Sequence, residues 1–371
     1  MCIRDSQGIV FVFFAEKFSI NLMANNEVIT WAIAFILYDF FYYWMHRCHH
    51  EIRILWATHV VHHHGEDFNL ATALRQTSTG FLWKWIFFAP MIMIGIPGEV
   101  FVSVAGVNLV YQFWVHTKHI GHLGWMEKIF ITPMNHRIHH AKNKEYIDAN
   151  YGGVFIIWDR MFGTYKAEEA EIEPIYGTVT PLRSWNPIWA NFQVFYQMLQ
   201  DSIQTKKASD KIKVWFSKTY WRPEDIRKTS KKYNINNIYN PKITNDMKYF
   251  ALYQLFMIII LSGMILLSLS AQTKFDTTVF ALSITIFATL TSMLLQNRSI
   301  SYFSIILCSI IFISIMLFMP AFDALNLKIK NAFILYAFVT AFLALCIMMF
   351  QYNLSLIHIS EPTRLRRISY A

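Results

Sequence analysis

Apolar residues are collected into long runs along this chain. The N-terminal half holds one run over about 28–45 and a second over 81–115, and the sequence IPGE at 96–99 breaks the second run. Because proline and glycine interrupt helices, the second run predicts a tight helical hairpin. Four more apolar runs follow, at roughly 250–270, 278–296, 300–319 and 332–350. About 20 apolar residues span a bilayer as a helix, so the pattern predicts an all-α, polytopic membrane helical bundle.

The stretch between these two groups of runs is polar and basic. From about 121 to 248 no apolar run is long enough to span, and ten lysines and arginines lie between 206 and 232. Positive charge marks the cytoplasmic side of membrane proteins, which is where we expect this connector. No recognised nucleic-acid fold accompanies the charge, so lipid headgroups are the expected partner and nucleic acid is not.

The composition agrees with a membrane location. Of the 371 residues, 55% are hydrophobic and only 15% are charged, and the mean hydropathy is +0.32. A soluble domain carries nearer to about a quarter charged residues, so a soluble enzyme is excluded. The four cysteines show no paired spacing and two lie in apolar runs, so no disulfide framework is expected.

The same pattern suggests a division of the chain. The segments 1–6 and 354–371 look like translated adapter sequence, and we expect neither to belong to the natural protein. Between them we expect a catalytic membrane domain at 7–166 that is truncated at its N-terminus, a basic connector at 167–248 and a four-helix membrane region at 249–353.

Histidines gather next to the ends of the apolar runs. The sequence HRCHH at 46–50 places two histidines four residues apart, and the motif HxxHH occurs twice, at 59–63 and 136–140. Positions i, i+3 and i+4 share one face of a helix, so each HxxHH motif is expected to present three imidazoles to one point. The candidate metal ligands are His46, His50, His59, His62, His63, His116, His136, His139 and His140.

Nine imidazoles are too many for one ion, because a structural zinc takes four ligands and a catalytic zinc usually three from the protein. They fit two ions with positions left open for oxygen or substrate. Imidazole ligands suit iron, copper and zinc alike, so ligand type does not select among these metals. Of the neighbouring histidines, His49 and His64 lie off the shared helix faces and His122 lies in a loop, whereas His119 is a candidate tenth ligand.

Three polar side chains are expected to support the ligands. Asp39 lies two helical turns before His46 and should accept the free N–H of a ligating imidazole, because a carboxylate inside an apolar span is costly unless it is paired. Glu66 and Asn69 follow the second cluster and are expected to act in the same way. A solvated loop position is the plain alternative for Glu66.

Three stretches carry a resemblance to a known family. They are DFFYYWMHRCHHEIRILWATHVVHHHGEDFNLATALRQ (39–76), QFWVHTKHIG (112–121) and TPMNHRIHHAKNKEYIDANYGGVFIIWDRMFGTY (132–165). They resemble the fatty acid hydroxylase/sterol desaturase superfamily. YWRPEDI at 220–226, followed by extra membrane helices, is similar to the alkylglycerol monooxygenase subgroup and its bacterial relatives. His64 and Gly65 depart from the small hydroxyl residues that are common at these positions in the family.

The resemblance implies a membrane enzyme in which the nine histidines hold two iron ions. Such an enzyme uses O2 to hydroxylate an unactivated C–H bond of a membrane lipid, with the site facing the cytoplasm of a bacterial inner membrane, or of the endoplasmic reticulum in a eukaryote. For the alkylglycerol subgroup it implies ether cleavage to a fatty aldehyde and a glycerol derivative, with electrons from tetrahydrobiopterin. No flavin, nicotinamide or haem motif occurs in the sequence, so we expect an external donor, either a pterin or a reductase.

Two alternatives stay open at this point. One is the same metal chemistry on a sterol, fatty acyl, sphingoid or carotenoid substrate, by hydroxylation or desaturation. The other is a membrane zinc enzyme or a metal transporter. A transporter places its polar ligands near the midplane of discontinuous helices, whereas these histidines lie beyond the ends of the apolar runs, so transport is disfavoured.

Overall fold

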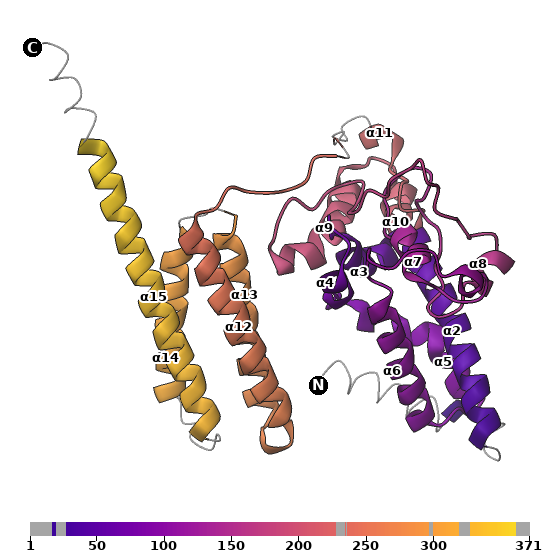
Figure 1. The fold of residues 1–371 in the computed structure, drawn as a ribbon, viewed down its shortest axis with the longest axis horizontal. Coiled ribbons are helices and arrows are strands. Elements are labelled where there is room, and N and C mark those ends of the chain that lie inside the picture. Colours follow the sequence, from indigo (N-terminus) through magenta and orange to yellow (C-terminus); the bar gives the residue numbers. More distant parts are fainter. Residues whose placement is uncertain are drawn as a thin grey trace, which may run out of the picture. The chain divides into compact units, whose positions relative to one another are not determined.

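A computed structural model describes residues 17–19, 27–227, 234, 236–296, 300–318 and 327–360 (Figure 1). In these ranges every regular element is a helix, and the only β-pairings are two isolated bridges, Phe130–Phe155 and Ala141–Tyr176. The all-α prediction is therefore confirmed. The chain divides into two compact units. Unit 1 comprises Met1–Arg183 and Trp189–Tyr239, and unit 2 comprises Ser184–Ile188 and Asn240–Ala371.

Three apolar helices form the membrane part of unit 1. They are α2 (Glu27–Glu51), α5 (Lys84–Met93) and α6 (Gly98–Trp114), with α5 and α6 both packed against α2 (Figure 1). The predicted hairpin is thus present as α5 and α6. α5 has ten residues, or about 15 Å of helix, which is half of the roughly 30 Å hydrocarbon core and too short to cross it.

Short helices gather at the end of α2 that carries the histidines. They are α3 (Arg53–His63), α4 (Leu70–Leu74), α7 (Pro133–His139) and α8 (Ile157–Met161), with the 3-10 turns η1 (Gly80–Leu82) and η2 (Gly124–Lys128). Local sequence sets where they begin. The Thr132 hydroxyl accepts a hydrogen bond from the Asn135 backbone N–H at the start of α7, and Pro133 occupies its first turn, both of which favour a helix start.

Much of the expected connector is folded onto unit 1. It forms α9 (Pro187–Gln204), α10 (Ala208–Phe216) and α11 (Glu224–Arg227). Met198 of α9 and Val214 of α10 are fully buried together with Ala57 of α3. The guanidinium group of Arg53 donates to the buried carboxylate of Asp201 at 2.7 Å. These contacts tie the segment to the histidine-bearing helix, while the domain boundaries at 166 and 248 remain predictions.

Unit 2 is a bundle of four long apolar helices. They are α12 (Asn245–Leu267), α13 (Lys274–Leu294), α14 (Ile300–Phe318) and α15 (Leu327–Ser360), with the 3-10 turn η3 (Leu269–Ala271) after α12. Fully buried aromatic rings hold them together, such as Phe280 and Phe333 with ring centroids 4.3 Å apart. All four apolar runs predicted for this half are therefore present as helices.

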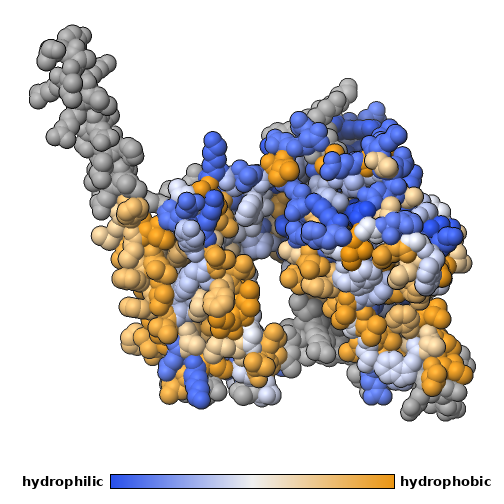
Figure 2. Space-filling view, in the orientation of Figure 1, coloured by the Kyte–Doolittle hydropathy of each residue, from blue (hydrophilic) through white to orange (hydrophobic). Residues whose placement is uncertain are grey.

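Four helices of the described ranges are long and apolar enough to cross a membrane, namely Val28–Glu51, Asn245–Leu267, Lys274–Leu294 and Leu327–Phe350. Figure 2 shows hydrophobic side chains over α2, α5 and α6 of unit 1, and hydrophilic side chains over the end of that unit that holds α7, α9 and α10. The candidate ligands on α2, α3 and α7 therefore lie where the apolar surface gives way to the polar one.

Candidate metal centre

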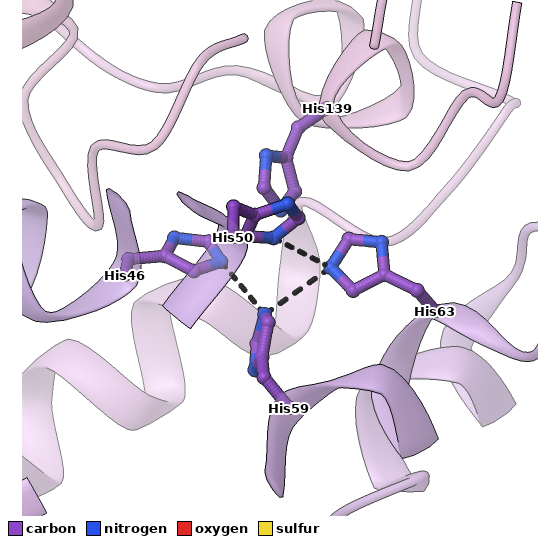
Figure 3. A group of neighbouring side chains, drawn as sticks. All are labelled: His46, His50, His59, His63 and His139. Atoms are coloured by element: carbon purple, nitrogen blue, oxygen red, sulfur yellow. Dashed lines mark hydrogen bonds between the residues drawn. The ribbon is translucent and has the colours of Figure 1, made fainter. Parts of the chain in front are cut away.

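The nine predicted histidines come together in unit 1 as two groups. The five-histidine group, drawn in Figure 3, contains His46, His50, His59, His63 and His139. The four-histidine group contains His62, His116, His136 and His140. Within each group one ring nitrogen per residue lies within 4.8 Å of those of the others. The two groups touch, since the rings of His63 and His140 stack with centroids 4.4 Å apart.

Each HxxHH motif is divided between the two groups. His59 and His63 of α3 join the five-histidine group, while His62 turns to the other. On α7 the division is reversed, because His136 and His140 join the four-histidine group and His139 joins the five-histidine group. The expectation that each motif presents three imidazoles to one point is therefore wrong. Positions i and i+4 differ by about 40° around a helix, whereas i+3 lies about 60° to the other side, so two centres can share one helix.

Backbone carbonyls define the protonation of several rings. The Nδ1 atom of His46 lies 2.8 Å from the Tyr151 carbonyl oxygen, that of His139 lies 2.9 Å from the Ala149 oxygen, and that of His116 lies 2.6 Å from the Gln112 oxygen. A carbonyl oxygen only accepts, so Nδ1 carries the proton in each ring. The neutral imidazole then has its lone pair on Nε2, the nitrogen that faces the centre of the group.

These lone pairs test whether a metal fits. The Nε2 atoms of His62 and His116 lie 3.2 Å apart, and the Nδ1 atom of His62 also faces a carbonyl, that of Arg75 at 3.3 Å. Two neutral acceptors at this distance do not bond to each other. The Nε2 atom of His139 is buried and has no hydrogen-bond partner among the described residues. A cation at the centre of each group satisfies every converging lone pair, so these residues fit transition-metal ions.

Burial keeps these imidazoles neutral. It lowers the pKa of His62 to about 3 and that of His116 to about 4. Burial also holds the pKa of five further rings well below the ordinary value, and neighbouring histidines add to the effect; the five are His59, His63, His136, His139 and His140. Neutral imidazole is the form that binds metal, so these seven rings need no deprotonation at neutral pH.

Asp39 does not contact an imidazole, and its expected role is wrong. Its buried carboxylate accepts hydrogen bonds from the backbone N–H groups of Val154 and Phe155 at 2.7 and 2.9 Å, from Trp158 Nε1 at 3.0 Å and from Asn108 Nδ2 at 3.1 Å. Asp39 therefore anchors the 151–158 loop to α2 and α6. The loop in turn supplies the carbonyl of Tyr151 to His46, so a backbone group orients that ring.

Asp159 is a supporting residue that the sequence reasoning missed. Its carboxylate is fully buried and accepts from the N–H groups of Tyr151 and Gly152 at 2.7 and 2.8 Å. Burial raises its pKa, against these hydrogen bonds. The sequence does contain a signal for this contact, since NYGG is followed a few residues later by WDRMFGTY. A carboxylate in a short apolar helix needs hydrogen-bond donors, and the backbone N–H groups of a glycine turn can supply them.

Glycine is required where this loop meets α2. A Cβ atom on Gly153 would lie 2.7 Å from the Asp39 Oδ1 atom and 2.9 Å from a ring carbon of Tyr42. These distances leave no room for a side chain. Gly153 therefore allows the loop backbone to approach Asp39 closely enough to form the hydrogen bonds described above.

Glu66 and Asn69 also lie away from the histidines. The Glu66 carboxylate accepts from the backbone N–H of Tyr239 at 2.7 Å. The exposed Asn69 side chain caps α4 by accepting from the Ala71 N–H at 2.9 Å. The support expected from both is thus wrong, because Glu66 bonds to the segment before α12 and Asn69 bonds within its own turn, to Ala71 and Asp67.

The remaining histidines stay outside both groups. His119 and His122 are exposed, so the structure does not bring His119 to the cluster as a tenth ligand. His49 is buried, with its Nδ1 atom 2.7 Å from the Met45 carbonyl oxygen. His64 is buried with its Nδ1 atom 3.4 Å from the Thr178 hydroxyl.

The fold and the site define an integral, multi-pass, all-helical membrane protein with two buried histidine groups whose chemistry fits metal ions. Residues 31–164 match the family model described as "Fatty acid hydroxylase". The matched region holds all nine histidines, and the match agrees with the resemblance carried by the sequence motifs.

Curated relatives point the same way. The chain is 39% identical to alkylglycerol monooxygenase of Homo sapiens over 213 residues, which is 57% of this chain and 47% of the relative. It is 42% identical to alkylglycerol monooxygenase of Xenopus tropicalis over 194 residues, 52% of this chain and 43% of the relative. Ornithine lipid hydroxylase OlsE of Rhizobium tropici is 28% identical over 149 residues, 36% of this chain and 43% of the relative. The chain thus spans about half the length of the relatives it matches. No solved structure matches it.

Proposed function

We propose that this protein is an oxygen-dependent lipid monooxygenase whose two histidine groups hold two iron ions. The observation that carries the proposal is the arrangement of nine imidazoles in two touching groups, inside a region that matches a fatty acid hydroxylase family model. Neither group includes a carboxylate from the described residues. Iron held by these residues would supply the activation of O2 for insertion of one oxygen atom into a C–H bond.

The substrate proposed is a glyceryl ether, because the chain is similar to alkylglycerol monooxygenases over more than half its length. Hydroxylation of the carbon next to the ether oxygen consumes O2, two electrons and two protons, and releases one water. The resulting hemiacetal breaks its C–O bond and yields a fatty aldehyde and a glycerol derivative. The electrons come from tetrahydrobiopterin or another external donor.

The chain's own residues orient the site. Tyr151, Ala149 and Gln112 hold three rings through their carbonyl oxygens, and Asp39 and Asp159 hold the loop that carries Tyr151. The site lies at the boundary between the apolar and the polar surface of unit 1, where an ether lipid can present its first chain carbon. We propose that the histidine-bearing end of unit 1 lies on the cytoplasmic side of the membrane, because the segment 206–232 is positively charged and positive charge marks that side.

The test supplies a long-chain alkylglycerol to detergent-solubilised membranes and traps aldehyde. Parallel reactions contain tetrahydrobiopterin, a ferredoxin system or a cytochrome b5 system, each with and without O2, and His140→Ala serves as the inactive control. Aldehyde that requires both O2 and the pterin is the expected result. Hydroxylated or newly unsaturated acyl or sterol products, formed with a protein donor and without aldehyde, would favour the alternative substrate classes, for which the similarity to ornithine lipid hydroxylase speaks.

A further inference from the structure

Unit 2 has a groove that takes no part in the proposed chemistry. It runs between α12 and α13 and has a volume of about 890 Å³. Its upper end is the end next to the start of α12, where Trp185 and the segment 240–243 line it. Every lining residue belongs to unit 2. The Ser184 hydroxyl donates to Gln296 Oε1 at 3.1 Å, just after α13, which holds the Trp185 segment in place. The volume falls in the range of small-molecule sites, about 300–1,000 Å³.

The length of the groove is apolar. On α12 its wall is Ala251, Leu252, Leu255 and Ile258, which recur at helical spacing below Lys248. Lys248 and Ile258 are ten residues apart, which corresponds to about 15 Å along a helix. This is about half of the hydrocarbon core of a bilayer, so the groove extends through one leaflet, as an acyl chain does.

The upper end of the groove is positively charged. Lys242 and Lys248 line it, both are exposed, and none of the lining residues is acidic. No carboxylate among the described residues forms a salt bridge with either lysine. The helix α12 also begins here, and the side chain of its N-cap residue Thr244 makes no capping hydrogen bond.

We propose that this groove binds an anionic phospholipid, with its phosphate at Lys242 and Lys248 and an acyl chain along α12 and α13. A lipid is the occupant that matches both ends, because a free phosphate leaves the apolar wall uncovered and an uncharged lipid leaves the lysines unpaired. Basic pockets between membrane helices bind anionic headgroups in this way. The basic segment 206–232 precedes α12 in the chain, as expected for the leaflet that carries anionic lipid. The inference is independent of the proposed oxidation.

Native mass spectrometry of the full chain in detergent tests the proposal. The probes are palmitoyl-oleoyl phosphatidylglycerol, phosphatidylcholine with the same acyl chains, and glycerophosphoglycerol, which has the headgroup without chains. Phosphatidylglycerol is expected to bind more tightly than the other two. The double variant Lys242→Gln/Lys248→Gln should weaken binding of the first phosphatidylglycerol by about twenty-five-fold, because each lysine near an anionic surface contributes about fivefold. The matched control is Lys274→Gln, an exposed lysine at the start of α13 outside the groove.

A second pair of variants tests the apolar wall. Ala288→Trp fills the groove and should weaken phosphatidylglycerol and phosphatidylcholine alike, whereas Ala281→Trp on the exposed face of α13 should weaken neither. Equal affinity for the two phospholipids in the unmodified protein would overturn the proposal. So would unchanged phosphatidylglycerol binding in the double lysine variant, or glycerophosphoglycerol binding as tightly as the intact lipid. Melting temperatures close to that of the unmodified chain establish that the variants are folded.

Discussion

The Nε2 atoms of His62 and His116 face each other at 3.2 Å, although a backbone carbonyl holds the proton of each ring on Nδ1. The two residues are 54 positions apart and come from α3 and from the segment just after α6. Two buried acceptors brought together without a donor lose the hydrogen bonds they would have in water. A cation between them removes this cost, so the arrangement predicts how the protein responds to loss of metal and of single ligands.

Substitution of single histidines should remove metal and turnover together. The unmodified chain, purified anaerobically, is expected to hold about two iron atoms, because its nine ligands form two groups. His63→Ala and His140→Ala should each lower the iron content and abolish product formation. The exposed His119 and His122 provide controls, and His119→Ala and His122→Ala should retain both. Elemental analysis by mass spectrometry measures the number of iron and zinc atoms per chain in each protein. One zinc and no iron in anaerobic preparations would rule out the two-iron proposal.

Asp39→Asn should weaken the site without touching a ligand. The asparagine amide keeps the volume but presents N–H groups where Asp39 accepts four hydrogen bonds. The loop should lose its anchor and the Tyr151 carbonyl should become mobile, with a loss in iron affinity of about 10–100-fold. Iron retention during stepwise chelation measures this effect. Asp67→Asn, at an exposed carboxylate paired with Lys118, is the control. Equal retention in the two variants would contradict the anchoring role of Asp39.

Gly153→Ala should destabilise the protein by about 2 kcal/mol, because an added Cβ atom overpacks a site that has no space. The new atom would lie 2.7 Å from Asp39 Oδ1 and 3.0 Å from Asn108 Nδ2. Gly106→Ala on α6 is the matched control, since its Cβ atom meets nothing within 4 Å and alanine is the better helix former. The two variants are compared by their apparent melting temperatures in detergent. Equal melting temperatures would show that the loop can shift to accommodate the Cβ atom at position 153.

Asp201→Ala should be strongly destabilising. Asp201 is almost fully buried and pairs with Arg53 at 2.7 Å and with Arg222 at 2.5 Å. Its removal leaves the buried Arg53 guanidinium without its carboxylate, which costs about 3–5 kcal/mol. Glu224→Ala, at an exposed position of α11, is expected to have no measurable effect on the melting temperature. Substitution of Arg53 by methionine in the Asp201→Ala background should recover part of the loss, since the buried unpaired charge is then removed and only the partly exposed Arg222 is left without Asp201.

Acid should destabilise the metal-free protein. In the folded chain burial holds the pKa of His59, His136 and the neighbouring rings far below the ordinary value, which is about 6.5 in an unfolded chain. Below this pH the unfolded chain binds more protons than the folded one, so stability falls as pH falls. The melting temperature of chelator-treated protein should therefore drop between pH 7.5 and pH 5.5. The melting temperature of the double variant His136→Gln/His140→Gln should drop less over the same pH range. The same dependence of melting temperature on pH in both proteins would exclude these imidazoles as the cause.

Several features follow from the sequence by itself because they depend on neighbouring residues. Apolar runs of membrane length became α2 and the four helices of unit 2, and the break at IPGE separates α5 from α6. Spacing along single helices was enough to select eight of the nine histidines that converge and to leave out His49 and His64, while His116 was selected by its place at the end of an apolar run. Their role as iron ligands remains a prediction, and so does the division into domains.

Only the tertiary structure decided how these residues combine. Helical spacing does not show that His62 and His139 each join a different group from the other two histidines of their own HxxHH motif. Which group a ring joins depends on the helices that pack on either side of it. Asp39 and the loop at 154–158 are more than a hundred residues apart, so no local pattern could reveal that the carboxylate holds a backbone turn rather than an imidazole. His119 has the spacing of a ligand, but the chain leaves the helix after Trp114 and carries the ring into solvent.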